Sequence, residues 1–168
     1  HFIGNCRGRE VTPKMVMDLG FDAITTNRMY QGEIAAVGST WRRRLLSLLS
    51  WKLGGLALMK FDYAKVVNNM SDPIDREEYC YPTILPGYDR TPRAGRSAHI
   101  YSNPNPKAFR EHVHDVLSYV KDKKEEHKIV ILKSWNEWGE GNYMEPDITF
   151  GHQYLDALRD EVLDDSAE

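Results

Sequence analysis

Strand-like segments alternate with helical segments along this chain, and this alternation limits the folds open to it. Four strands are predicted, at residues 2–5, 21–26, 80–85 and 128–135. The last is a continuous aliphatic run, which is typical of a strand buried on both faces. Regular alternation of this kind predicts an α/β fold with a parallel sheet and helical crossovers.

The predicted helices have recognisable ends and separate the strands. Thr12-Pro13 and Asn105-Pro106 each combine a capping side chain with proline at the first helical position, and Gly20 is suited to a helix end. Further helical segments are predicted within 27–70 and at 150–163. A complete (β/α)8 TIM barrel takes about 250 residues. Four β/α units would therefore make about half of such a barrel, and an open α/β sheet is the alternative.

Composition supports one globular domain over residues 1–168 and argues against several classes of partner. The chain has 168 residues, of which 41% are hydrophobic and 28% charged. Its net charge of -3 offers no field that attracts nucleic acid. Cys6 and Cys80 lack the spacing of a zinc site or a disulfide framework. No signal peptide or membrane-spanning run is evident, so the cytoplasm is favoured, although a chain that opens on His1 suggests a start further upstream.

The segment SWNEWGEGNYMEPD, residues 134–147, carries the most chemical information. It follows the last predicted strand, at the carboxyl end, where α/β proteins place their ligand sites. Glu137 and Glu140 can divide acid and base work between two carboxylates, as in glycoside cleavage. Trp135, Asn136 and Trp138 are suited to the faces and hydroxyl groups of a sugar. The alternative is a capped turn with solvated glutamates.

At these residues the sequence resembles a known family. SWNEWGEGNYMEPDITFGHQYL, with the upstream PGYDRTPR and GFDA, is similar to the C-terminal part of the WbsX-like proteins, which are described as glycosyltransferases of lipopolysaccharide or O-antigen synthesis. That family is related to the endo-α-mannosidases, glycoside hydrolases with a (β/α)8 barrel and a similar loop. The resemblance implies that this chain is the C-terminal half of such a barrel.

The resemblance also implies roles for individual residues. Glu137 would act as a base on the 2-hydroxyl of the sugar, and Glu140 as the general acid and base at the glycosidic oxygen. The endo-α-mannosidases carry a histidine where this chain has Gly139. The remaining candidates for substrate contact are Tyr88, Asp89, Arg93 and Glu145. Tyr88 would form an aromatic wall, and Asp89 and Arg93 would either bind hydroxyl groups or pair with each other. Glu145, with Asp147, would support the loop or touch the substrate.

Two other patterns have less specific explanations. His112 and His114 are two residues apart on a predicted helix and do not face the same way, so they are interpreted as solvated flank residues and not as metal ligands. The apolar stripe within 41–53, beside three arginines, either lies on a membrane surface or packs against its own domain, and packing is the commoner outcome.

The sequence therefore predicts a carbohydrate-active enzyme, a glycoside hydrolase or a glycosyltransferase, that acts on an oligosaccharide or polysaccharide without a metal or other cofactor. A non-catalytic sugar-binding protein is one alternative. Another is a fragment that needs its missing half, because a half barrel leaves two open sheet edges, which a second copy of the chain could cover.

Overall fold

The computed structural model describes residues 1–6, 11–53 and 59–165. The strands in this part of the chain are short: β1 (Ile3–Cys6), β2 (Ala23–Thr26), β3 (Lys60–Asp62), β4 (Cys80–Tyr81), β5 (Thr83–Ile84), β6 (Ile100–Ser102), β7 (Ile131–Leu132), β8 (Asn136–Glu137) and β9 (Asn142–Tyr143). The α-helices are α1 (Pro13–Asp18), α2 (Met29–Val37), α3 (Thr40–Lys52), α4 (Tyr63–Val67), α5 (Thr91–Ala94), α6 (Pro106–Val120) and α7 (Gln153–Asp165). Short 3₁₀ turns are η1 (Pro73–Arg76), η2 (Gly95–Ser97), η3 (Glu125–His127) and η4 (Trp138–Glu140).

The principal strands pair in parallel and in chain order. β1 pairs with β2, β2 with β4, and β5 with β7. Pro82 lies between β4 and β5, and its carbonyl accepts a hydrogen bond from the Ile131 backbone at 2.8 Å. Residues 80–84 thus form one extended segment that pairs with β2 on one side and β7 on the other. The predicted mixed α/β fold with parallel strands is confirmed, but the described strands do not close into a barrel.

Helix ends follow the predicted chemistry. The Thr12 hydroxyl accepts a hydrogen bond from the Met15 backbone, and the Asn105 side chain accepts one from Ala108. Both helices begin with proline, which has no backbone N–H to leave unpaired. Gly20 has a φ of 88°, a left-handed conformation that glycine adopts readily just beyond a helix.

Two strand predictions need correction. The run 128–135 forms a strand only at β7, and its aliphatic side chains are half-buried, because Val130 and Leu132 pack toward α6 and α7 while Ile131 lines an open cavity. The prediction that the whole run is buried on both faces was therefore wrong. The segment 27–70 is not uniformly helical. It includes β3, which pairs in parallel with β6 and was not predicted from the sequence.

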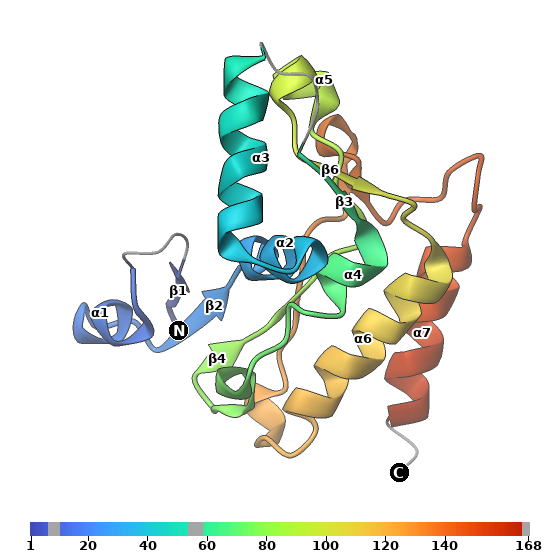
Figure 1. Ribbon diagram of the computed structural model, residues 1–168. Coiled ribbons are helices and arrows are strands. Elements are labelled where there is room, and N and C mark those ends of the chain that lie inside the picture. The colour runs from blue at the N-terminus through green and yellow to red at the C-terminus, as the bar shows by residue number, and fades with distance from the viewer. Residues whose placement is uncertain (7–10, 54–58, 166–168) are drawn as a thin grey trace.

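Two large apolar clusters hold the helices to these strands. One surrounds α4 and the β3–β6 pair and includes the buried rings of Phe61, Tyr63 and Tyr101. The other lies between β5, α6 and α7, where the rings of Phe109 and Tyr154 pack at a tilted angle with centroids 5.3 Å apart. Figure 1 shows α6 and α7 lying side by side, while α3 stands at the margin of the molecule. Cys6 and Cys80 are free thiols.

The interpretation of His112 as a solvated residue was wrong. His112 is fully buried, whereas His114 is exposed and pairs with Glu161. The spacing explains the difference, because His112 follows Phe109 by three residues and precedes Val116 by four, which places it on the apolar stripe of α6. Burial lowers the pKa of His112 to about 4.

This buried imidazole predicts a loss of stability in mild acid. Its folded pKa of about 4 lies below the unfolded value of 6.5, so protons bind preferentially to the unfolded chain as the pH falls below 6.5. The contribution of neutral His112 to the free energy of unfolding is fully present above pH 6.5 and is lost progressively as the pH falls toward 4. The free energy of unfolding should fall by about 2 kcal/mol between pH 7.5 and pH 5, as measured by urea denaturation.

The variant His112→Leu should flatten this pH dependence, while His152→Gln, at an exposed position, should retain it. The carboxyl group of Glu161 is partly buried, but its contacts with Arg110 and His114 hold its pKa below the ordinary value. Its protonation therefore affects stability at a lower pH than that of His112. An unchanged slope in His112→Leu would assign the effect to another group.

The inward face of α3 is polar and anchored. Glu33 on α2 is buried and accepts hydrogen bonds from Arg43 Nε at 2.7 Å and from the Tyr101 hydroxyl at 3.1 Å, with His99 Nδ1 at 2.9 Å. Burial acts to raise the pKa of Glu33, but His99 and Arg43 hold it below its ordinary value. Arg43 thus fixes α3 to α2, and Glu33 links this contact to Tyr101 on β6.

The apolar stripe of α3 does not pack against the described part of its own domain, contrary to the commoner expectation. Trp41, Leu45 and Leu48 are 63%, 44% and 56% exposed. No helix in the described ranges is long and apolar enough to cross a membrane.

Candidate active site

A cavity of about 440 Å³ opens at the carboxyl ends of the parallel strands. Its floor comes from residues in or just after the strands, and its rim from two loops. The lining residues are Asn5, Thr25, Asn27, Met29, Thr83, Tyr88, Arg90, Ile131, Leu132, Lys133, Ser134 and Glu140. This is the position at which α/β proteins bind ligands.

The loop with the two glutamates is a small antiparallel hairpin. β8 pairs with β9, and η4 forms the turn between them. Gly141 closes the turn with a φ of 54°, a conformation that costs a glycine little. At the base, Asn142 is buried, its side-chain oxygen accepts from the Ser134 backbone, and its carbonyl accepts from the Ser134 hydroxyl, each at 2.9 Å. The hairpin is therefore fixed directly to the end of β7.

A backbone hydrogen bond joins this hairpin to the second loop. The Asp89 N–H donates to the Glu140 carbonyl at 2.7 Å, and the Asp89 carboxylate accepts from the Thr91 backbone at 2.8 Å at the start of α5. This contact places the Tyr88 ring and the Glu140 carboxylate on the same cavity.

Cations surround the glutamates. Arg93 contacts Glu137 Oε1 at 2.9 Å and Glu140 Oε1 at 3.5 Å. Arg90 Nε lies 3.5 Å from Glu140 Oε1, and Lys133 Nζ lies 3.9 Å from Glu140 Oε2. Three cations therefore meet two carboxylates at the mouth of the cavity.

Gly139 gives Arg93 room to bridge the two glutamates. A Cβ atom at this position would lie 3.3 Å from both Arg93 Nε and Glu137 Oε1. A larger residue there would require the arginine to shift.

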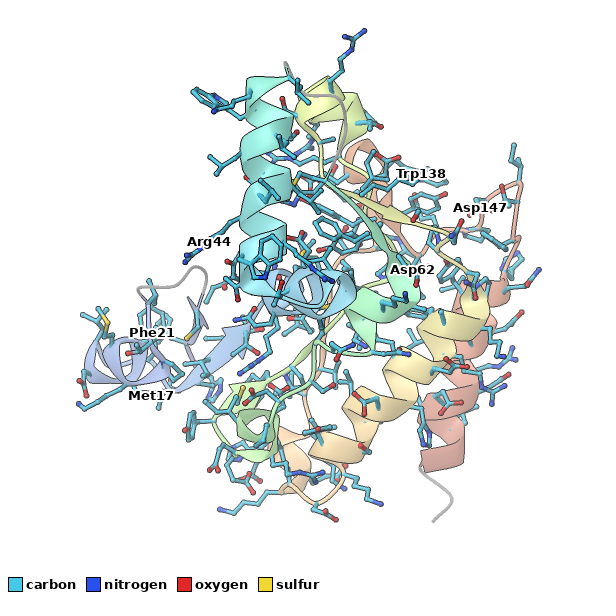
Figure 2. All side chains as sticks on the ribbon, viewed as in Figure 1. Met17, Phe21, Arg44, Asp62, Trp138 and Asp147 are labelled. Carbon is cyan, nitrogen blue, oxygen red and sulfur yellow. The ribbon has the colours of Figure 1, made fainter. Side chains whose placement is uncertain are left out.

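The tryptophans lie on the rim, and Trp138 is tightly held. Its ring stacks on Tyr143 with centroids 3.7 Å apart, and its Nε1 donates to Glu145 Oε2 at 2.6 Å. Tyr143 in turn donates to Asp147 at 3.2 Å. Figure 2 shows Trp138 and Asp147 on the same side of the molecule. Trp135 is half exposed, so both indole rings remain accessible.

The structure brings some predicted residues to the cavity and leaves others at its edge. Glu140 and Tyr88 line the cavity, and Arg93 forms ion pairs with both Glu140 and Glu137. The remaining predicted residues lie outside the cavity lining: Trp135, Asn136, Trp138, Asp89 and Glu145. The alternative that Asp89 and Arg93 pair with each other was wrong, since each has a different partner.

Several lining residues were missed from the sequence. Asn5 and Asn27 lie at or just beyond the carboxyl ends of predicted strands, and Lys133 lies near the end of another, and this position was the available signal. Arg90 adjoins Asp89 but was not singled out. Among the described residues, no group of three His, Cys, Asp or Glu side chains is arranged to hold a metal ion.

The hydrogen bond of Trp138 to Glu145 leads to a prediction for substrate binding. Glu145→Ala should raise KM about fivefold with little change in kcat, because losing one hydrogen bond worth about 1 kcal/mol loosens the ring. Glu145→Gln keeps an oxygen that can accept from the indole and serves as the matched control. Equal effects of the two variants on KM in steady-state assays would show that the charge, and not the hydrogen bond, matters.

Parallel strands, helical crossovers and a polar cavity at the strand ends define an α/β protein whose cavity lies where such proteins bind their ligands. The chain belongs to the WbsX glycosyltransferase family, whose model matches residues 5–158. The family predicted from the loop sequence is thereby confirmed.

The chain is also similar to curated proteins and to a solved structure. Two proteins named uncharacterized protein WxcX, from two strains of Xanthomonas campestris pv. campestris, are 31% and 30% identical over 100 and 99 residues. These matches cover 59% and 58% of this chain but 14% of each relative. The solved structure of a glycoside hydrolase-like protein is 23% identical with a TM-score of 0.54, and the match covers 95% of this chain and 43% of that one. This likeness concerns the fold.

Proposed function

We propose that this chain is part of a carbohydrate-active enzyme that makes or breaks a glycosidic bond through Glu140 and Glu137. The observation that carries the proposal is the position of Glu140, whose largely buried carboxylate lines the cavity at the strand ends. Glu137 lies in the same hairpin, and Arg93 contacts both carboxylates. Two carboxyl groups at one site are what glycosidic chemistry requires.

The roles follow the family resemblance. Glu140 acts as the general acid and base at the glycosidic oxygen, since it lines the cavity, and Glu137 acts on the 2-hydroxyl from the rim. Tyr88 forms one aromatic wall. Around these the rim residues bind the substrate: Trp135, Asn136, Trp138, Asp89, Arg93 and Glu145. The substrate class is an oligosaccharide or polysaccharide, and the proposed chemistry uses no metal.

The fold supports a more specific proposal about architecture. The strands pair in parallel and in chain order: β1, then β2, then the segment that contains β4 and β5, then β7. A singly wound (β/α) barrel has the same strand order. We assign residues 1–168 to one domain that corresponds to the C-terminal half of such a barrel. The match to 43% of the length of the glycoside hydrolase-like protein is consistent with this assignment.

The cations at the site favour transfer as a second candidate reaction. Arg90 and Lys133 line the same cavity as Glu140. Guanidinium and ammonium groups stabilise the phosphate of an activated sugar donor. A glycosyltransferase that uses a phosphate-linked donor would therefore use these cations, and a hydrolase would use them to orient Glu140.

The test separates an enzyme from a non-catalytic sugar-binding protein. The intact protein is assayed for release of reducing sugar from α-linked glycans and for transfer from nucleotide sugars, alongside binding of the same glycans by calorimetry. In Glu137→Gln/Glu140→Gln, turnover should be lost while glycan binding stays within a few-fold of wild type. Binding by the wild-type protein without any turnover would support the sugar-binding alternative.

A further inference from the structure

Helix α3 is amphipathic, but its more apolar face points away from the core of its own domain. Arg43, Leu46 and Ser50 form its inward stripe, with Arg43 tied to Glu33 and Ser50 buried. Trp41, Leu45, Leu48 and Lys52 follow one another at spacings of three and four residues and form the outward stripe. The more apolar of the two faces is thus the one in contact with solvent.

The outward face is also strongly cationic. Beside Lys52, the flanks carry Arg42 and Arg44, and α3 contains no acidic residue. Figure 2 shows Arg44 extending away from the ribbon on the outer side of α3. Trp51, at the far end, is 79% exposed. The chain as a whole has a net charge of -3, so this helix is a local concentration of positive charge.

We propose that the outward face of α3 docks on a membrane surface that carries anionic headgroups. A helix with tryptophan and leucine on one face and flanking lysine and arginine lies in the interfacial plane, with its apolar side chains below the headgroups. The two tryptophans are ten residues apart, or about 15 Å along the axis, so both can insert while the helix lies flat. The cations extend to the headgroups along their aliphatic stems.

The charge pattern distinguishes a membrane from a second copy of the chain. In a two-fold symmetric dimer across this face, Arg42, Arg44 and Lys52 would meet the same residues of the other copy, and α3 offers no anion to pair with them. An anionic lipid surface complements all three.

The position of α3 relates the docking face to the candidate site. Thr40 and Arg44 line a second cavity of about 630 Å³, and Asn27 lines both this cavity and the one that contains Glu140. A docked α3 would therefore hold the glutamate site close to the lipid surface. The inference does not depend on the proposed reaction.

The test measures binding of the intact protein to vesicles by co-sedimentation. Partition into vesicles of phosphatidylcholine mixed with phosphatidylglycerol should be on the order of 100-fold stronger than into phosphatidylcholine alone, since each of three cations contributes about 1 kcal/mol near an anionic surface. Binding should weaken as salt is raised.

Paired variants locate the surface. Trp41→Gln/Leu48→Gln should abolish vesicle binding and, because both side chains are exposed, leave the protein folded by circular dichroism. Met15→Gln/Leu163→Gln, which changes exposed apolar residues on α1 and α7, should bind as wild type does. Absence of vesicle binding, or equal binding by both double variants, would overturn the proposal. So would a dimer in sedimentation that Trp41→Gln/Leu48→Gln dissociates, since the face would then be a protein contact.

Discussion

Glu140→Gln should lower kcat about 1000-fold while leaving KM within a few-fold of wild type. The substitution keeps the size of the side chain but removes a group that can donate and accept a proton, and general acid–base catalysis of this kind is worth about 10²–10⁴ in rate. The largely buried carboxylate lines the cavity and contacts Arg93 and Lys133, so no neighbouring acid in the described structure is placed to replace it in the lining. Steady-state kinetics on the best substrate from the assays above would measure the effect.

A matched control is Glu126→Gln. Glu126 is exposed in η3, before the start of β7, at the opposite end of that strand from the cavity, and its substitution should leave kcat unchanged. Thermal unfolding of both variants checks that the fold is intact. If Glu140→Gln retained more than half of the wild-type kcat, Glu140 would not transfer a proton in the reaction.

Gly141→Ala should destabilise the protein by about 3 kcal/mol and reduce activity by about 100-fold. At a φ of 54° an alanine costs about 1–2 kcal/mol, and its Cβ would lie 2.9 Å from Asp89 Cβ and 3.0 Å from the Asp89 backbone nitrogen. The hairpin must then move away from the second loop and carry Glu140 with it. A displacement of about 1 Å at a catalytic group costs about 10² in rate.

Gly151→Ala separates backbone strain from collision. Gly151 has a φ of 56°, but nothing lies within 4 Å of the position of an added Cβ. This variant should lose only about 1 kcal/mol and keep its activity. Urea denaturation and steady-state kinetics would be measured on Gly141→Ala and Gly151→Ala. Equal losses of stability and activity in the two variants would show that the close approach of the two loops is not important.

Much of the fold was accessible from local sequence patterns. Thr12-Pro13 and Asn105-Pro106 fix helix starts through a side-chain oxygen and a proline ring, so both were predictable from a few residues. The parallel arrangement followed from the alternation of strands and helices. Burial of the run 128–135 could not be read in the same way, because it depends on which elements cover the sheet, and an aliphatic run carries no information about those partners.

The candidate site was only partly predictable, for a similar reason. Glu137 and Glu140 were identified because an unusual loop carried them and a family shares that loop. The approach of Arg90 and Arg93 depends on contact between segments more than 40 residues apart in sequence, whereas Lys133 is near Glu140 along the chain. His112 is a different case, since its spacing from Phe109 already placed it on the buried stripe of α6.

The roles of Glu137 and Glu140 are tested most directly by a crystal structure of the intact protein with an α-mannoside-type iminosugar, a mimic of a positively charged transition state. We expect the ligand to occupy the cavity lined by Tyr88 and Glu140, with its ring nitrogen against the carboxylates of Glu140 and Glu137 and with Trp135 or Trp138 beside it. An empty cavity, with a nucleotide sugar bound elsewhere in a parallel soak, would contradict the roles assigned to the two glutamates.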